Sequence, residues 1–376
     1  MTTPTLARKP IANLQRSQAD PRAHIDWVML AATVLLAAVG LLAVYTAKAR
    51  NIELSGGDPL YYVKRQAVAL VLGGVGMLVV MAISYRRLRD FAFVFYLGTA
   101  GLLMGVLLKG STVNGAEAWF NIGPFQLQPS EFAKVTLVLT LAAYLARERG
   151  GSLPHNRFVG SLVILALPAG LVLLQPDLGT ASVLVSITMG ILLVAGASWR
   201  AIAAVSLMAL ISVAAVLGTG TLDSYQKDRI TAFMNQNPTK DNRDIVLQVQ
   251  NSKTAIAAGG ITGEGYLDGA YTNGGYVPEQ HTDFVFSAIG EQFGMLGGAA
   301  LLLLYGILGW RVWRTARMSK DQLGMLICAG ALTMLAWHVF ENVGMTMGIT
   351  PVTGIPLPLV SYGGSSVIAT LALLGL

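Results

Sequence analysis

A short segment, residues 277–286, carries the side chains best suited to acid–base chemistry. It reads Val-Pro-Glu-Gln-His-Thr-Asp-Phe-Val-Phe, and its carboxylate Asp283 stands where a polar stretch passes into an apolar one. Partial burial there would raise the pKa of Asp283, and nearby cations would lower it. A carboxylate poised in this way can act as a general base. The competing interpretation is an aspartate that only caps the next helix, with His281 as an ordinary surface residue.

A second segment, residues 128–134, reads Gln-Pro-Ser-Glu-Phe-Ala-Lys at the start of an apolar run. Glu131 and Lys134 are three residues apart, so they share one face of a helix that begins after Pro129 and can form an ion pair. Ser130 is the expected N-cap of that helix. Ionisable residues at membrane depth are costly and are therefore candidates for function. Two interpretations stay open: a structural ion pair that joins two helices, or a lysine that serves an anionic head group.

The third segment, Asn342–Ser365, combines three prolines with five glycines. The prolines remove backbone donors, and the glycines allow close approach of other backbone. Near membrane depth such irregular backbone is tolerated only where it is buried in protein or lines a cavity. The segment is therefore expected to be either a re-entrant loop beside an active cavity or a structural plug.

The composition places all three segments in a membrane protein. The 376 residues are 54% hydrophobic and only 12% charged, against about 25% charged in soluble domains, and the mean hydropathy is +0.59. The net charge of +6 comes from short basic clusters between apolar runs, a pattern of membrane loops that argues against nucleic acid as a partner. The single cysteine, Cys328, excludes a disulfide within the chain.

Apolar runs long enough to cross about 30 Å of hydrocarbon recur along the chain. We therefore predict an all-α polytopic membrane protein with about ten transmembrane helices. The expected spans are residues 27–47, 67–84, 91–108, 132–146, 158–174, 181–198, 201–218, 292–313, 322–340 and 363–376. The last span is short, so it tilts, continues from the proline-rich segment before it, or is cut off by the end of the sequence.

The distribution of Lys and Arg predicts the orientation, because cytoplasmic loops are richer in both residues. Most of them fall in alternate short loops that lie inside if the N-terminus is inside. Ten spans then bring the C-terminus to the same, cytoplasmic side. Residues 1–24 are expected to be a disordered cytoplasmic tail, and residues 25–376 a transmembrane domain. The long loop 219–282, between helices seven and eight, is extracytoplasmic, and long loops are typically functional or disordered.

Over residues 25–376 the chain resembles the SEDS family (shape, elongation, division and sporulation proteins). Four segments carry the resemblance: Gln128–Glu131 with Lys134, Gln175–Thr180, Pro278–Phe284 and Asn342–Ser366. The third, followed by Val-Phe-Ser, is closer to the RodA-like elongation branch than to the FtsW-like division branch. The chain departs from the family pattern at Ala118, Glu264 and Gln292.

The resemblance implies a peptidoglycan glycosyltransferase that polymerises lipid II into β-1,4-linked glycan strands for cell elongation and shape. The family's essential acidic residue falls on Asp283, its paired charges on Glu131 and Lys134, and an arginine of the second helix on Arg65. Also implied are a divalent cation (Mg2+ or Mn2+), a class B penicillin-binding protein with transpeptidase activity as partner, and a multi-pass location in the bacterial inner (cytoplasmic) membrane. No organic cofactor is expected.

For this reaction we expect Asp283 to be the general base on the acceptor sugar. Arg65, Lys134 and a metal whose ligands the sequence does not specify are the candidates to stabilise the leaving pyrophosphate. The expected substrate-binding residues are Arg65, Gln128, Ser130, Glu131, Lys134, Lys253, His281, Thr282, Asn342, Ser361, Tyr362, Gly363 and Gly364.

Three alternatives remain at this point. A lipid II flippase would need a charged path across the whole membrane, whereas the ionisable residues here gather toward the outer side. A scaffold that only anchors the penicillin-binding protein would leave Asp283, Glu131 and Lys134 without a chemical purpose. Within the family, the alternative is an FtsW-like division glycosyltransferase.

Overall fold

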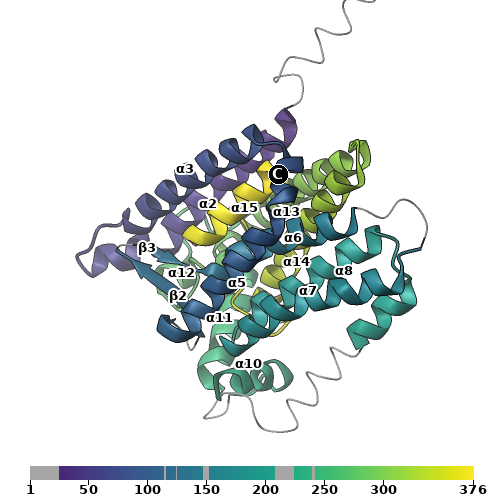
Figure 1. Ribbon diagram of the computed structural model, residues 1–376. Coiled ribbons are helices and arrows are strands. Elements are labelled where there is room, and N and C mark those ends of the chain that lie inside the picture. Colours follow the sequence, from purple (N-terminus) through teal and green to yellow (C-terminus); the bar gives the residue numbers. More distant parts are fainter. Residues whose placement is uncertain (1–24, 114–115, 124, 147–151, 208–223, 239–241) are drawn as a thin grey trace, which may run out of the picture.

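The computed structural model describes residues 25–113, 116–123, 125–146, 152–207, 224–238 and 242–376. The chain forms a bundle of helices that run back and forth between two ends of the molecule (Figure 1). The end that carries α10 and Asp283 is termed the loop face, and the opposite end, which carries Arg86, Arg317 and Lys320, is termed the basic face. The helices of the bundle are α2 (Trp27–Leu54), α3 (Tyr61–Ala82), α5 (Ala92–Lys109), α6 (Pro129–Leu145), α7 (His155–Leu174), α8 (Leu178–Val194), α13 (Val285–Met318), α14 (Gln322–Thr346) and α15 (Gly364–Gly375).

Six of these helices, α2, α3, α5, α7, α13 and α14, are long and apolar enough to cross a membrane. In the described part of the chain α6 and α8 follow with 17 residues each and α15 with 12. The predicted all-α polytopic architecture is confirmed. The expected seventh span, 201–218, lies largely outside the described residues, which are helical over 199–207, and the expected tail 1–24 lies outside them.

Helix α13 begins at Val285, earlier than the expected start at residue 292. A kink at Gly294 (φ 64°, ψ −162°) separates these first turns from the rest of the helix. At the kink two backbone amides leave the helical pattern and bond to the long loop: Met295 N donates to Gly260 O (2.9 Å) and Leu296 N to Ile261 O (3.1 Å). The turns before the kink bury the polar side chain of Glu291. A search for uninterrupted apolar residues therefore misses them.

The loop face carries most of the connecting structure. The long loop contains α10 (Ser224–Met234), α11 (Arg243–Ala258) and α12 (Ala270–Asn273). Glu291 on α13 accepts hydrogen bonds from Tyr271 N (2.6 Å) and Thr272 N (2.9 Å), so a buried carboxylate secures α12 to the bundle. A short helix, α4 (Tyr85–Asp90), connects α3 to α5 on the basic face.

A small antiparallel sheet between α5 and α6 was not expected from the sequence. Its strands are β1 (Ser111–Val113), β2 (Ala116–Ile122) and β3 (Phe125–Leu127), in the order β1-β2-β3. Two of the three strands have only three residues, too few for an alternating pattern to stand out. Ser365 at the start of α15 bonds to the sheet end, donating to Gln126 O (3.2 Å).

Most of the proline-rich segment between α14 and α15, residues 347–363, is buried or partly buried in the bundle, whereas Met347 and Ile349 at its start are exposed. Leu357, Leu359 and Val360 are at most 1% exposed. A Cβ on Gly40 of α2 would lie 2.4 Å from Leu359 O, so only glycine permits this approach. The short last helix continues from this buried segment, which is one of the three arrangements expected for it.

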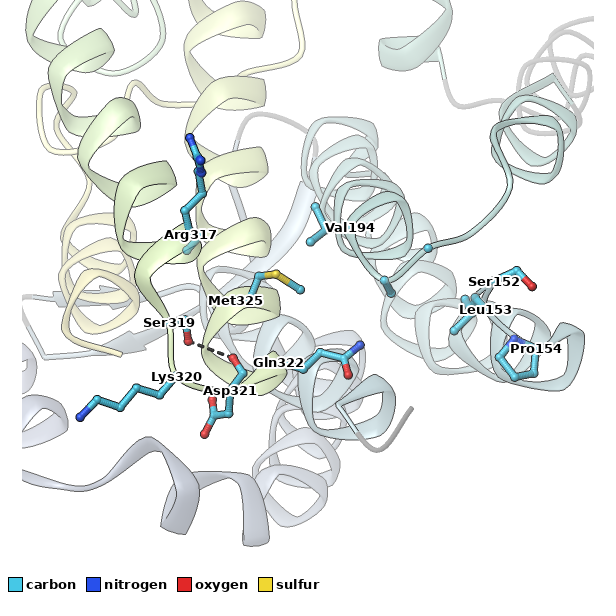
Figure 2. A pocket seen from close by; sticks show the side chains of 13 residues that line it. Ser152, Leu153, Pro154, Val194, Arg317, Ser319, Lys320, Asp321, Gln322 and Met325 are labelled. Atoms are coloured by element: carbon cyan, nitrogen blue, oxygen red, sulfur yellow. Dashed lines mark hydrogen bonds between the residues drawn. The ribbon is translucent and has the colours of Figure 1, made fainter. Parts of the chain in front are cut away.

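A cavity of about 580 Å3 opens on the basic face, between the α7–α8 side and the α13–α14 corner. Figure 2 shows Ser152 and Leu153 on one side, while Lys320 and Asp321 on the other side extend away from them. Asp321 caps α14 through Gly324 N (3.0 Å) and pairs with the exposed arginine of α4. The cavity and Asp283 lie at opposite ends of α13, and the part of the helix after the kink at Gly294 alone spans about 36 Å.

Candidate active site

Asp283 lies in a turn directly before α13, on the loop face. Its backbone amide donates to Glu279 O (3.0 Å), which closes the turn 279–283. The residue that precedes the first turn of α13 is Phe284, with no side-chain capping bond. The capping interpretation of Asp283 is therefore wrong, and its partly buried carboxylate is left for another purpose.

Asn342 on α14 holds this turn against the proline-rich segment. Its Nδ2 donates to Asp283 O (2.8 Å) and to Ile355 O (2.9 Å), and the side chain is fully buried. Asn342 was expected to bind substrate. In the structure both amide hydrogens are used to position the backbone of Asp283.

The surroundings of Asp283 change its acidity in a way that suits a base. Burial, together with the neighbouring Glu279 carboxylate, raises the pKa of the carboxyl from its ordinary value of 3.8 to about 7. Arg229 and a hydrogen bond from Thr282 lower the pKa, while Asp177 raises it by the smallest contribution of these groups. A carboxyl with a pKa near the working pH is half ionised there and combines availability with proton affinity.

Arg229, from α10 in the long loop, was not singled out by the sequence analysis. Its Nη1 donates to Thr353 O (3.0 Å). Beside it Gly354 has φ +75°, and a Cβ there would lie 3.4 Å from both Arg229 Nη2 and Asp283 Oδ2. The glycine thus lets a guanidinium and a carboxylate from separate elements converge on one piece of backbone.

An aromatic cluster borders the turn 279–283. The ring centroid of Tyr62 lies 4.7 Å from that of His281 and 5.0 Å from that of Tyr362, and Arg65 lies over the ring of Tyr61 at 5.0 Å. Burial, reinforced by Lys48, lowers the pKa of His281 to about 3, so the imidazole is neutral at physiological pH. Within the described residues, His281 Nδ1 has no hydrogen-bond partner although it is buried.

Four of the expected contacts, Ser361 to Gly364, build the turn that leads into α15. The buried side chain of Gln66 donates to Ser361 O (3.0 Å) and accepts from Gly363 N (3.2 Å). Tyr362 N donates to His281 O (2.9 Å), which joins this turn to the turn of Asp283. The structure therefore brings two sequence segments, predicted separately, into one site.

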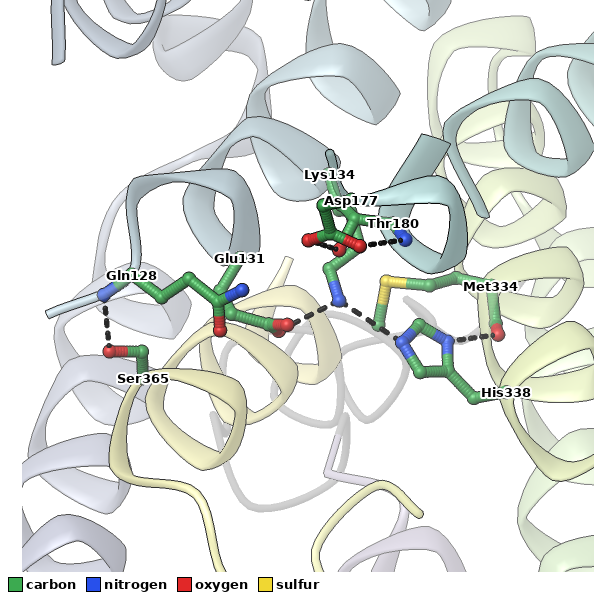
Figure 3. A network of polar contacts seen from close by, with 8 residues as sticks. All are labelled: Gln128, Glu131, Lys134, Asp177, Thr180, Met334, His338 and Ser365. Atoms are coloured by element: carbon green, nitrogen blue, oxygen red, sulfur yellow. Dashed lines mark hydrogen bonds and ion pairs between the residues drawn. The ribbon is translucent and has the colours of Figure 1, made fainter. Parts of the chain in front are cut away.

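Glu131 and Lys134 form the expected ion pair, with Nζ 2.8 Å from Oε2 and side chains 4% and 2% exposed. Lys134 Nζ also lies 3.0 Å from His338 Nε2, and His338 Nδ1 lies 2.8 Å from Met334 O. Because a carbonyl can only accept, the imidazole hydrogen is on Nδ1 and Nε2 accepts from the lysine. Figure 3 shows this chain of contacts joining α6 to α14, with Asp177 beside Lys134. The geometry matches the structural interpretation of the pair.

The remaining expected residues are placed as follows. Gln128, not Ser130, is the N-cap residue of α6, because Pro129 takes the first helical position, which proline favours. The Ser130 hydroxyl is buried and has no partner within the described residues. Gln128 N donates to Ser365 Oγ (3.0 Å), and Lys253 on α11 donates to Gln236 Oε1 (2.9 Å).

Comparison with known proteins places the chain in a family. The model of the FtsW, RodA and SpoVE cell cycle proteins matches residues 26–376. The chain belongs to this family. Stage V sporulation protein E of Bacillus subtilis is 33% identical, covering 93% of the chain and 95% of the relative. The peptidoglycan glycosyltransferase MrdB of Escherichia coli is 33% identical, over 94% and 93%, and the probable peptidoglycan glycosyltransferase FtsW of Halorhodospira halophila is 38% identical, over 94% and 88%.

Solved structures of the FtsW, RodA and SpoVE family have the same fold. The crystal structure of the Thermus thermophilus rod shape determining protein RodA matches with a TM-score of 0.69 at 32% identity, over 94% of the chain and 95% of RodA. A second structure, described as coordinating polymerization and crosslinking in a peptidoglycan synthase complex, matches with a TM-score of 0.78 at 34% identity, over 94% and 96%.

Three site residues of this family member were missed from sequence. Asp177 stood inside a quoted motif, Gln175–Thr180, and could have been found there; it caps α8 through Thr180 N (2.8 Å). His338 lies in an apolar helix, and no residue near it in the sequence indicates that it pairs with Lys134. Arg229 lies in a loop rich in charges, and only the fold selects it. The described residues contain no group of three or more His, Cys, Asp or Glu side chains that could hold a metal ion.

Proposed function

We propose that the chain is a peptidoglycan glycosyltransferase that polymerises lipid II into β-1,4-linked glycan strands. The observation that carries the proposal is Asp283, a partly buried carboxyl with a pKa of about 7, held between the 279–283 turn and the proline-rich segment. The names of relatives at about one-third identity support it, since they include peptidoglycan glycosyltransferase.

In the proposed reaction Asp283 accepts the proton of the 4-hydroxyl of the acceptor's GlcNAc. The oxygen then attacks the anomeric carbon of the donor strand, and the bond from that carbon to polyprenyl diphosphate breaks with its electron pair on the leaving oxygen. An α-linked donor and a β-linked product mean inversion in one displacement, so one base suffices and no covalent sugar intermediate forms.

The leaving diphosphate needs positive charge in a water-poor site. Lys134 is engaged with Glu131 and His338, so among the expected cations Arg65, beside the aromatic cluster, is the better placed. The described residues do not form a metal site of their own. We propose that any divalent cation, Mg2+ or Mn2+, is carried in by the diphosphate, a ligand that Mg2+ prefers to all-protein sites.

The proposed setting is the outer face of the bacterial inner membrane, in cell elongation. The chain is 33% identical to MrdB and to stage V sporulation protein E and 38% identical to the Halorhodospira halophila FtsW, so identity does not favour elongation. The proposed elongation role rests on the 278–287 motif and on the similarity to the RodA structures. The proposed partner is a class B penicillin-binding protein that cross-links the strands. The synthase complex named for one structural neighbour supports a partner of this kind.

A flippase is the rival function, and the site favours the enzyme. Alternating access needs polar groups along a path across the membrane. Here Asp283 lies in a turn, Arg229 on α10 and Glu131 in the first turn of α6, all on the loop face. The cavity at the basic face lies at the far end of the kinked α13 from Asp283. We therefore do not propose transport for this chain.

The test is polymerisation of purified lipid II by the full chain in detergent, alone and with its penicillin-binding protein whose transpeptidase is blocked. Asp283→Asn should reduce the rate by about 100-fold or more, the usual contribution of a general base. Asp244→Asn, an exposed aspartate of the same loop, is the matched control and should keep wild-type activity.

Neither variant should melt below the wild type, since Asp283 does not cap its helix and its ionised form is disfavoured by burial. Near-normal polymer from a folded Asp283→Asn protein would remove the general base from the proposal. A wild-type chain that is folded, supplied with partner and Mg2+, and still makes no polymer would contradict the proposed function as a whole.

A further inference from the structure

The proposed reaction leaves one electrostatic problem, and its solution rests on that proposed function. The diphosphate leaves with added negative charge, and fixed cations near it would lower the barrier. Lys134, the expected cation of α6, is 2% exposed and bonded to both Glu131 and His338. Moving it to a ligand would leave the buried Glu131 carboxylate without its partner, at a high cost.

Arg229 is a second cation, and it lies close to Asp283. It is partly exposed, comes from α10, and reaches the buried proline-rich segment through Thr353 O (3.0 Å). Its Nη2 and Asp283 Oδ2 both lie 3.4 Å from the Cβ position of Gly354. The guanidinium and the base therefore lie on the same side of Gly354, and φ +75° at this position disfavours any residue whose side chain would fill the space between them.

The geometry points to Arg229 as the residue that binds the donor's diphosphate during the displacement. A guanidinium presents five N–H donors in a fixed fork, so it can hold Thr353 O and phosphate oxygens at the same time. The planar fork also matches two phosphate oxygens, which the point charge of a lysine does not. As the bond from the anomeric carbon to oxygen breaks, that oxygen takes the electron pair and Arg229 stabilises its charge, while Asp283 keeps the proton of the acceptor hydroxyl.

This assignment has a second consequence for Asp283. The groups that act on its carboxyl are Glu279 and Thr282 in its own turn, Arg229 from α10 and Asp177 before α8. Arg229 is the cation among them and lowers the pKa of Asp283, against the effect of burial. Its removal should therefore move the acid limb of the pH–rate profile to higher pH. An arginine that only held Thr353 in place would not predict a loss of diphosphate binding.

The experiment uses farnesyl diphosphate and farnesyl monophosphate as probes of the full chain in detergent. Binding is measured by thermal shift, and inhibition by lipid II polymerisation. The wild type should prefer the diphosphate, and Arg229→Gln should lose that preference by about 10- to 100-fold, as expected for charge-assisted hydrogen bonds. Arg229→Lys should keep part of it. The matched control is Arg243→Gln, an exposed arginine of the same loop.

The outcomes separate the inference from the proposed function. An Arg229→Gln protein that loses polymerisation but keeps the full preference for the diphosphate would overturn the inference and leave Arg229 as a support for Thr353. If Arg229→Gln does not fold, Arg229→Lys is measured in its place, and an undiminished preference for the diphosphate would again overturn the inference. If the wild type makes no polymer, the proposed function fails, while the binding measurement still decides whether Arg229 holds a diphosphate.

Discussion

Two charged regions of this molecule solve the problem of burial in opposite ways. Lys134 is buried with Glu131 at 2.8 Å and His338 at 3.0 Å, so its ammonium has partners on α6 and α14. Asp283 is only partly buried, yet burial and Glu279 outweigh Arg229, and the pKa of its carboxyl rises to about 7. In the first region the paired charges join two helices. In the second region burial disfavours the ionised carboxylate of Asp283, which raises its proton affinity to a level suited to a general base.

The difference is visible in the expected dependence of stability on pH. Asp283 has a folded pKa of about 7 against an ordinary value of 3.8, so between these values the folded chain binds the proton more tightly than the unfolded chain. Stability from this group is therefore full below pH 4 and is lost as the pH rises toward 7. The catalytic rate changes in the reverse direction, because the base works only when it is ionised.

The largest effect on stability is expected from breaking the Lys134 region. Lys134→Met leaves the Glu131 carboxylate buried without a counter-charge, which costs about 3–5 kcal/mol in comparable buried pairs. The double variant with Glu131→Gln should recover most of this loss, because a neutral pair needs no counter-charge. Thermal unfolding in detergent measures both.

The control for this prediction is Lys64→Met. Lys64 pairs with Asp58 at the shorter distance of 2.6 Å, but the two side chains are 64% and 47% exposed, so no measurable change is expected. Asp283→Asn should not destabilise the chain above pH 7. Equal losses from Lys134→Met and Lys64→Met would contradict the contrast between a buried and an exposed pair.

The sequence predicted the architecture well and the details of the site only in part. Long apolar runs identified the helices. The segments 128–134, 277–286 and 342–365, singled out from the sequence, are joined by hydrogen bonds on the loop face. Ser130 was expected to cap α6, but local propensity gave way to Pro129 at the first helical position. Arg229 and His338 could not be selected, because their partners Thr353 and Lys134 are 124 and 204 residues away.

A smaller effect is expected at Asn342, which connects the two regions by holding α14 to the turn of Asp283. Asn342→Leu keeps the volume but leaves the buried carbonyl of Ile355 without this donor, at about 1–3 kcal/mol, and removes the bond to the part-buried carbonyl of Asp283. The rate of polymerisation should fall more than the melting temperature predicts, because the base loses its position. A variant that loses stability but has wild-type activity per folded molecule would show that the backbone bonds do not position Asp283.

The smallest effect, and the sharpest test of the Asp283 region, is expected from Glu279→Gln. The rate should rise with pH through about 7 in the wild type, since Asp283 must be ionised to accept a proton. Glu279 raises the pKa of Asp283, so neutralising it should move this limb to lower pH by a fraction of a unit and leave the plateau rate nearly unchanged. The pH–rate profile of lipid II polymerisation measures both.

The control for this prediction is His281→Gln. The pKa of His281, about 3, keeps the imidazole neutral across the range, so its replacement should leave the limb in place. If the limb of the pH–rate profile moves in His281→Gln and stays in place in Glu279→Gln, the titrating group is His281 and not Asp283, and Asp283 is not the base.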